Sequence, residues 1–173
     1  MTSREFFQRA TGGKKDFVRS FVGVLRSRRL PFCVIGGLAV NAYAEPVVSL
    51  DLDLVVAAEG IEDLVDLLSK KFRVERFENS VNVSLPGSDL RIQIQTDPRY
   101  QDFIRRSKKL RTLGYLLPVA NIRDVLQGKI WAALDQSRRA SKRQKDLADI
   151  LRLIETDPGL KSLIPHELAG RLL

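Results

Sequence analysis

Two aspartates separated by one residue are the strongest chemical feature of this sequence. Asp51 and Asp53 lie in the segment LDLDLVVA (50–57), which alternates acidic and apolar residues before it becomes fully apolar. Side chains i and i+2 of a strand point to the same face, so the two carboxylates are expected to lie together. A divalent ion, Mg²⁺ or Mn²⁺, would relieve their repulsion, because such a hard cation binds carboxylate oxygens and bridges to triphosphate oxygens. The alternative is an edge strand with an exposed acidic face, which the following apolar residues disfavour.

A pair of glycines precedes the aspartates in the chain. Gly36 and Gly37 follow the apolar run FCVI (32–35), which is typical of a buried strand, and precede a short helix expected in LAVNAYA (38–44). A glycine pair leaves no side chain over a helix N-terminus, so phosphate oxygens can approach the backbone N–H groups there. Glycine pairs occur in many loops, so this pair alone is a weak signal; the aspartates that follow it make a nucleotide site more specific. We therefore predict that Gly36 and Gly37 bind nucleotide.

Charged residues at helical spacing near the C-terminus are further candidates for catalysis. On a helix expected over 142–155, Lys145 and Asp149 are four residues apart and share a face. A lysine there could contact a triphosphate as a point charge. Asp149 could hold either Lys145 or Lys129, which lies on the preceding helix expected over 121–135. The alternative is an ordinary surface ion pair worth about 0.3–0.5 kcal/mol, and the spacing alone favours it.

The elements that must position these residues alternate irregularly between helix and strand. Helices are expected over 3–10, 15–29, 38–44, 61–71, 98–106, 121–135 and 142–155, and strands over 32–35, 50–57, 72–77, 81–85 and 90–95. Consecutive strands that resemble hairpins indicate an α+β fold rather than a doubly wound sheet. We expect N-terminal helices packed on the domain over 1–30, a core over 31–118 and a C-terminal helical segment over 119–173.

Composition excludes several other kinds of site. Cys33 is the only cysteine, which rules out an internal disulfide and a thiolate metal cluster, and His166 is the only histidine, which disfavours a zinc site or a histidine-based triad. No apolar run approaches the roughly 18–20 residues that span a bilayer. The N-terminus has no apolar segment of the kind found in signal peptides. We therefore expect a cytoplasmic protein, not bound to membrane, that uses phosphate and carboxylate chemistry.

The net charge of +8 is unevenly distributed along the chain. Residues 31–98 carry −6, whereas residues 1–30 carry +6 and residues 99–145 carry +10. Solvated helix faces account for part of this excess, but it also suits a polyanionic partner such as a nucleotide, a tRNA or another RNA. One basic run beside the predicted site is either an RNA-facing patch or the end of a soluble helix. Its members are Arg105, Arg106, Lys108, Lys109 and Arg111.

The glycine and aspartate motifs together, GG-x-A and D-x-D, resemble those of the polymerase-β-like nucleotidyltransferase superfamily. Near the C-terminus, a second set of residues resembles the K-x-x-A…R-x-K-D-x-x-D pattern of the minimal nucleotidyltransferases, which include the toxin subunits of bacterial AbiE-type abortive-infection systems. That set consists of Lys129, Ala132, Arg143, Lys145, Asp146 and Asp149. The resemblance covers residues 31–156. It implies a short mixed sheet flanked by helices, Mg²⁺, ATP or another nucleoside triphosphate as donor, and transfer of a nucleotide to RNA or protein.

Two positions depart from the pattern of this superfamily. Many relatives carry an arginine four residues before the first aspartate of the pair, where this chain has Val47. Active relatives also supply a third carboxylate from a later strand, usually as the base that deprotonates the attacking hydroxyl. The corresponding residue here is Gln93, a neutral amide that cannot act as a base but can still face a bound nucleotide. Asp89 and Asp97 flank that strand, but each is expected at a turn.

Three hypotheses about function follow. An active nucleotidyltransferase would modify the end of a tRNA or a hydroxyl of a partner protein, and the resemblance suggests membership in a toxin–antitoxin or phage-defence pair. A catalytically degenerate member of the same fold would bind nucleotide or RNA without turnover, as Gln93 suggests. In the third hypothesis the acids are incidental, and the chain is a structural or interaction protein.

Overall fold

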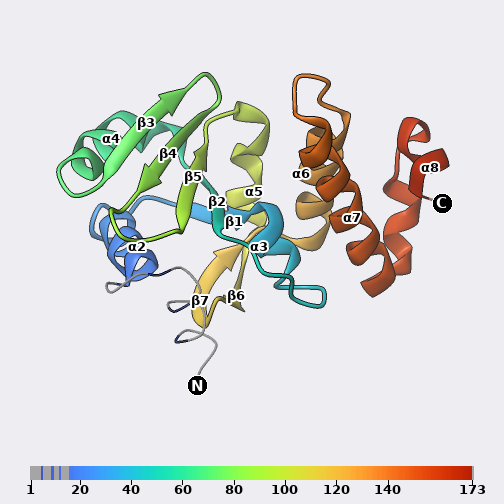
Figure 1. The fold of residues 1–173 in the computed structure, drawn as a ribbon, viewed down its shortest axis with the longest axis horizontal. Coiled ribbons are helices and arrows are strands. Elements are labelled where there is room, and N and C mark those ends of the chain that lie inside the picture. Colours follow the sequence, from blue (N-terminus) through green and yellow to red (C-terminus); the bar gives the residue numbers. More distant parts are fainter. Residues whose placement is uncertain (1–4, 6–8, 10–11, 13–15, 173) are drawn as a thin grey trace.

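A single mixed β-sheet organises the computed structural model, which describes residues 5, 9, 12 and 16–172 (Figure 1). Its strands within these residues are β1 (Phe32–Ile35), β2 (Asp51–Val56), β3 (Arg73–Phe77), β4 (Ser80–Ser84), β5 (Arg91–Gln95), β6 (Lys108–Thr112) and β7 (Tyr115–Val119). They are arranged in the order β3-β4-β5-β2-β1-β7-β6. β2 is parallel to β5 and β1 is parallel to β7, whereas the other neighbours are antiparallel. The mixed sheet confirms the predicted α+β class.

Helices flank this sheet. They are α2 (Phe17–Ser27), α3 (Gly36–Val40), α4 (Ile61–Ser69), α5 (Gln101–Arg106), α6 (Ile122–Leu134), α7 (Ala140–Thr156) and α8 (His166–Leu172), with 3₁₀ turns η1 (Ala58–Gly60), η2 (Pro98–Tyr100) and η3 (Pro158–Leu163). Figure 1 shows α6 and α7 side by side, with α8 beyond them at the C-terminal end. The helix expected over 3–10 lies largely outside the described residues. No helix in the described part of the chain is both long and apolar enough to cross a membrane.

Strand alternation separates a core face from a polar face in the centre of the sheet. Leu52 and Leu54 of β2 are fully buried in the hydrophobic core. The residues beside them, Asp51 and Asp53, point the other way and line a pocket. Because β2 lies between β1 and β5, it is a central strand, and the alternative of an exposed acidic edge strand is wrong.

The hairpin of β6 and β7 was not expected from the sequence. Its strands join through Leu113 and Gly114, whose φ angles of 54° and 77° form the left-handed two-residue turn that hairpins favour. β6 is the outer strand of the sheet, so the interpretation of 108–111 as a helix end is wrong. Lysine and arginine suit such a strand, because charged side chains discourage pairing with a further strand.

Candidate active site

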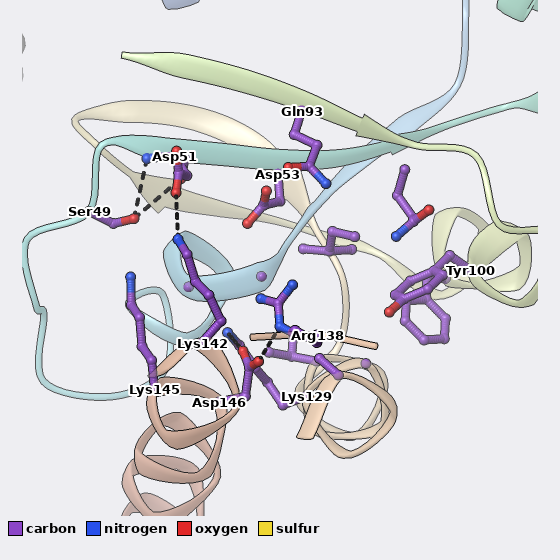
Figure 2. A pocket seen from close by; sticks show the side chains of 18 of the residues that line it. Ser49, Asp51, Asp53, Gln93, Tyr100, Lys129, Arg138, Lys142, Lys145 and Asp146 are labelled. Carbon is purple, nitrogen blue, oxygen red and sulfur yellow. Dashed lines mark hydrogen bonds and ion pairs between the residues drawn. The ribbon is translucent and has the colours of Figure 1, made fainter. Parts of the chain in front are cut away.

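One pocket gathers residues from the centre of the sheet and from the C-terminal helices (Figure 2). Its volume is about 190 Å³. The predicted site residues that line it are Gly36, Gly37, Asp51, Asp53, Gln93, Lys129 and Lys145. Asp149 is the one predicted site residue that does not line it. The structure therefore brings together residues that are far apart in the sequence, although their chemical roles stay predictions.

Asp53 lies directly against the glycine turn. Ile35 pairs with Asp53 across β1 and β2, which places Gly36 beside the carboxylate. A Cβ atom at Gly36 would lie 2.2 Å from Asp53 Oδ2, and φ at Gly36 is +68°. Both the space and the backbone conformation therefore require glycine. α3 begins at this glycine, two residues earlier than expected, so the pair forms the first turn of the helix instead of preceding it.

The register between β2 and β5 determines what faces the two aspartates. Asp51 pairs with Arg91, and Asp53 pairs with Gln93. Arg91 Nη2 lies 2.8 Å from Asp51 Oδ1, and Lys142 Nζ from α7 lies 3.8 Å from Asp51 Oδ2. Gln93 thus lies beside Asp53 on the neighbouring strand. That it stands in place of a third carboxylate stays a prediction.

The negative charge of Asp53 is balanced only by cations that do not contact it, chiefly Lys129. The Asp53 side chain forms no hydrogen bond or ion pair with another residue that the structure describes. Burial raises the pKa of the Asp53 carboxyl above its ordinary value, against the opposing charge of Lys129, and the nearby Asp51 raises it further. A desolvated carboxylate without a direct partner favours binding of a cation.

The oxygen donors at this point of the pocket suit a hard divalent ion. Asp51 and Asp53 offer carboxylates, and Gln93 offers an amide oxygen, which are ligand types that Mg²⁺ and Mn²⁺ accept. Within the described residues, no cluster of three or more His, Cys, Asp or Glu side chains could hold a metal. Asp51, Asp53 and Gln93 would offer an ion three oxygen donors, and phosphate or water oxygens would have to supply the rest of its coordination.

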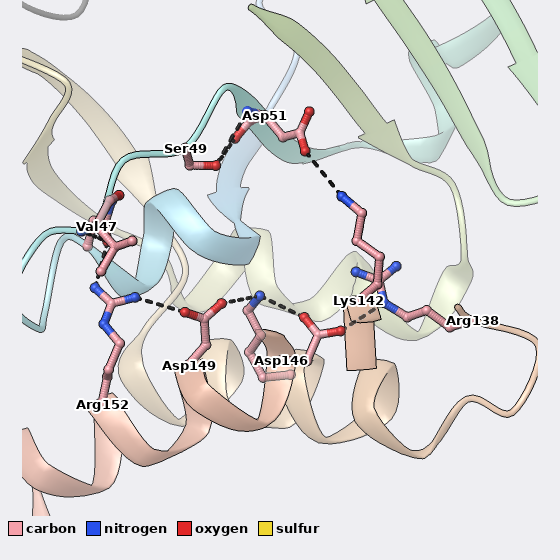
Figure 3. Close-up of polar contacts among 10 residues, drawn as sticks. Val47, Ser49, Asp51, Arg138, Lys142, Asp146, Asp149 and Arg152 are labelled. Carbon is pink, nitrogen blue, oxygen red and sulfur yellow. Dashed lines mark hydrogen bonds and ion pairs between the residues drawn. The ribbon is translucent and has the colours of Figure 1, made fainter. Parts of the chain in front are cut away.

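The helical wall of the pocket contains a chain of five alternating charges (Figure 3). At its centre, Lys129 Nζ lies 2.9 Å from Asp146 Oδ1 and 2.7 Å from Asp149 Oδ2. Arg138 Nε lies 2.8 Å from Asp146 Oδ2 at one end, and Arg152 Nη1 lies 2.8 Å from Asp149 Oδ1 at the other. The Lys129 side chain is 9% exposed, and those of the two aspartates are less exposed still. These pairs connect α6 to α7 beneath the pocket.

This arrangement changes the expected roles of Lys129 and Asp149. Burial alone would lower the pKa of Lys129, but the charges and hydrogen bonds of Asp149 and Asp146 outweigh it and raise that pKa. Lys129 is therefore a protonated amine whose partners lie within the protein. The interpretation of Lys145 and Asp149 as a surface pair is wrong, because buried Asp149 binds Lys129 and Arg152. Both Lys129 and Asp149 are placed to position the helices.

The cations that remain available to a ligand come mainly from α7 and the loop before it. Lys142 and Lys145 project from α7 into the pocket, and Arg138 lies between them and Tyr100 (Figure 2). Lys145 forms no ion pair with any described residue. Neither Lys142 nor Arg138 was predicted from the sequence. The spacing of three residues between Lys142 and Lys145 is a signal for a shared helix face, but nothing in the sequence marks Arg138.

Arg152 of α7 reaches the loop that contains Val47, the position at which many relatives carry an arginine. The backbone of Val47 forms two hydrogen bonds with the side chain of Asn41, at 2.7 and 3.0 Å. Arg152 Nη2 donates to Asn41 Oδ1 at 2.7 Å and also to the carbonyl oxygen of Glu45. Figure 3 shows Arg152 beside Val47. A guanidinium is therefore present here although the sequence position expected to supply it holds valine.

Neither acid that flanks β5 takes the place of a third carboxylate. Asp97 accepts the backbone N–H of Arg99 at 3.0 Å and pairs with the guanidinium of that residue. Asp89 lies in the segment before β5, and neither acid lines the pocket. Neither Asp89 nor Asp97 therefore supplies the pocket with the carboxylate that Gln93 lacks.

The basic run of residues 105–111 lies at the edge of the pocket and does not line it. None of its charged members is a lining residue. The link to the pocket is Arg106, whose Nη2 lies 2.8 Å from Oδ1 of the lining residue Asp124. The run therefore borders the pocket through Arg106, and its role as an RNA-facing patch stays a prediction.

Comparison with known proteins places the fold. No protein-family model and no curated protein matches this chain. Solved structures do match it, among them the antibiotic-resistance factor ANT(2'')-Ia, with a TM-score of 0.54 and 14% identity over 84% of this chain and 90% of that one. The lincosamide antibiotic adenylyltransferase LnuA gives a TM-score of 0.54 at 8% identity over 79% and 95% of the two chains. TM1012, a candidate nucleotidyltransferase from Thermotoga maritima, gives 0.50 at 19% identity over 76% and 91%.

These identities are low, so the likeness concerns architecture. The neighbours share the mixed sheet and flanking helices over most of both chains. The chain has the polymerase-β-like nucleotidyltransferase fold.

Proposed function

We propose that this chain is a nucleotidyltransferase that uses Mg²⁺ or Mn²⁺ and takes a nucleoside triphosphate, ATP in the first instance, as donor. The observation that carries the proposal is the meeting of Asp51 and Asp53 with the Gly36 turn in one pocket. The structural neighbours support the same chemistry, since two of them are named as an adenylyltransferase and as ANT(2'')-Ia bound to adenylyl-2''-tobramycin.

The chain's own residues divide the task of holding the donor. Asp51 and Asp53 would hold the ion, which when bound would neutralise both carboxylates and withdraw charge from the phosphates. Lys142, Lys145 and Arg138 would bind phosphate oxygens from the opposite wall. The glycines leave the space above β1 free of side chains. In the reaction, the acceptor oxygen bonds to the α-phosphorus, the bond from that phosphorus to the bridging oxygen breaks, and pyrophosphate leaves.

The proton of the acceptor hydroxyl has no carboxylate on β5 to receive it. Gln93 lies beside Asp53 and can orient a hydroxyl by hydrogen bonding, but it takes up no proton. The proton would therefore pass to water in the pocket. We infer slow turnover, because a positioned general base contributes on the order of 10²–10⁴ in rate.

Gln93 also favours a second candidate function, a catalytically degenerate member that binds nucleotide or RNA. Such a protein needs the cations and the pocket but not the base. The two candidates make the same prediction for nucleotide binding and opposite predictions for transfer.

The acceptor we propose is the end of a tRNA or another RNA, or a hydroxyl on a partner protein. The basic charge of residues 99–145 supports a polyanionic acceptor. The resemblance to AbiE-type toxins supports a cytoplasmic role in a toxin–antitoxin or phage-defence pair, with a cognate partner protein. We further propose that residues 31–118 form the catalytic core, with 1–30 and 119–173 as helical additions.

Transfer of label from α-³²P-ATP tests the proposal. The protein would be incubated with Mg²⁺ and either bulk tRNA or cell lysate, and labelled acceptors separated on denaturing gels. Label that appears with wild type and disappears with Asp53→Ala supports transfer at this pocket. Label transfer that survives Asp53→Ala would contradict it. Binding of ATP without any transfer would favour the degenerate member.

A further inference from the structure

Asp51 is held from two sides by cations of the chain itself. Its Oδ1 lies 2.8 Å from Arg91 Nη2, and its Oδ2 lies 3.8 Å from Lys142 Nζ. The two cations belong to different elements, β5 and α7, and both line the pocket. Figure 2 shows the Lys142 side chain extending toward Asp51 from the helical wall. A residue suited to bind a metal thus already has two positive partners.

These partners would oppose a free divalent ion. An ion held jointly by Asp51 and Asp53 would lie within a few ångströms of the Arg91 guanidinium and the Lys142 ammonium, and like charges at such distances repel each other. Asp53 lacks a comparable ion pair among the described residues. The repulsion of a free divalent ion therefore comes from Arg91 and Lys142, the cations that pair with Asp51.

A polyphosphate removes the conflict. Arginine and lysine form charge-assisted hydrogen bonds with phosphate oxygens. The side chains of Arg91 and Lys142 are 47% and 37% exposed, so each has room to turn from Asp51 to a ligand in the pocket. Each cation then exchanges one anionic partner for another, and Asp51 becomes available to the ion.

We propose that Arg91 and Lys142 exchange partners in this way: they pair with Asp51 when no divalent ion is bound there, and with the polyphosphate when the ion takes Asp51. The pocket thereby rejects free divalent ions and accepts the ion together with its nucleotide. This inference rests on the proposed function only in assuming that the pocket binds an ion and a nucleotide. Because coupling is reciprocal, the ion must raise nucleotide affinity by the factor by which nucleotide raises ion affinity.

Binding of Mn²⁺, followed by electron paramagnetic resonance of the free ion, tests the exchange without any measurement of turnover. Arg91→Gln and Lys142→Gln should each raise the affinity for Mn²⁺ alone by about fivefold or more. Each should also reduce the factor by which a non-hydrolysable ATP analogue strengthens Mn²⁺ binding. Arg91→Lys keeps the charge and should resemble wild type. Circular dichroism would verify that these variants fold.

A cation in the same pocket that does not touch Asp51 is the matched control. Lys145→Gln should weaken binding of the ATP analogue, yet raise the affinity for Mn²⁺ alone far less than Arg91→Gln does. If Mn²⁺ and the analogue bind together but neither Gln variant binds Mn²⁺ alone more tightly than wild type, the exchange is refuted while the nucleotide site stands. If neither wild type nor any of the variants binds Mn²⁺, even in the presence of the analogue, both the exchange and the proposed function are refuted.

Discussion

The two walls of the pocket hold their charges in opposite ways. On the sheet wall, Asp53 is half-buried with no direct ionic partner among the described residues, and Asp51 meets exposed cations. On the helical wall, buried Lys129 is satisfied by Asp146 and Asp149. The sheet wall therefore keeps charge available for a ligand, whereas the buried charges of the helical wall fix α6 against α7. Changes to the sheet wall, or to the exposed lysines of α7, should affect binding and turnover, and changes to the buried charges of the helical wall should affect stability.

The largest effect is expected from Lys129→Met, on the helical wall. Removing one partner of a buried ion pair leaves an uncompensated charge and costs about 3–5 kcal/mol. Two buried aspartates lose their shared partner here. Chemical denaturation would measure the loss. Arg76→Met is the control, because its pair with Glu62 is exposed to solvent and should contribute little to stability. Equal losses for the two variants would contradict the division between the walls.

On the sheet wall, Asp53→Asn should strongly reduce nucleotide transfer while sparing the fold. We expect transfer to fall by on the order of 10²–10³, the loss that follows removal of one preorganised electrostatic group in an active site. The free energy of unfolding of the metal-free protein should not fall, because burial disfavours the ionised carboxyl. Quantified label transfer and denaturation on the same samples test this. A destabilised variant with full activity would reverse the assignment.

Gln93→Glu should raise the rate of transfer by about tenfold or more, because it restores a proton acceptor beside Asp53. Gln95→Glu is the control, since Gln95 also lines the pocket but pairs with Val55 instead of an aspartate. Initial rates at saturating ATP would compare them. A gain in the Gln95 variant alone would show that Gln93 does not hold the position of the base.

A smaller effect is expected from Lys145→Gln, which removes a cation that has no ionic partner among the described residues. Loss of one charge-assisted hydrogen bond at an exposed site costs about 1 kcal/mol, or about fivefold in affinity for ATP. Stability should be unchanged, in contrast to Lys129→Met. Calorimetric titration with a non-hydrolysable ATP analogue, with Lys161→Gln as a control outside the pocket, would measure it. Unaltered affinity would exclude Lys145 from the phosphate site.

The smallest effect concerns pH. The pKa of Asp53 is raised in the folded protein above its value of 3.8 in an unperturbed chain. The folded state therefore binds this proton more tightly, so stability increases as pH falls through the folded pKa and is lost again as pH rises through it. In EDTA, wild type should gain stability relative to Asp53→Asn as pH falls from neutral into the acid range. Parallel melting curves for the two proteins would contradict the shift.

The features that could be predicted from the sequence are those set by a few neighbouring residues. The two-residue period of β2 places Asp51 and Asp53 on one face wherever the strand lies, and the glycine pair marks a turn through its lack of side chains. The assignment of Gln93 to the position of a third carboxylate came from resemblance and stays a prediction; the parallel register of β2 and β5 places its side chain beside Asp53.

Long-range pairing accounts for what the sequence could not predict. The partners of Lys129 depend on how α6 and α7 cross, and the approach of Arg152 to Asn41 joins residues that are 111 positions apart. The β6–β7 hairpin was missed because β6 is rich in lysine and arginine and its turn has leucine in a left-handed conformation. These features depend on tertiary packing, which composition and periodicity do not encode.

Everything proposed for this pocket depends on Asp51 and Asp53 forming a metal–nucleotide site against the Gly36 turn. Calorimetric titration of wild type and Asp53→Asn with a non-hydrolysable ATP analogue in Mg²⁺ is the test we would perform first. We expect binding by wild type that weakens at least about tenfold in the variant, and also when EDTA removes the ion. Equal binding by both proteins, or binding that is indifferent to Mg²⁺, would contradict it.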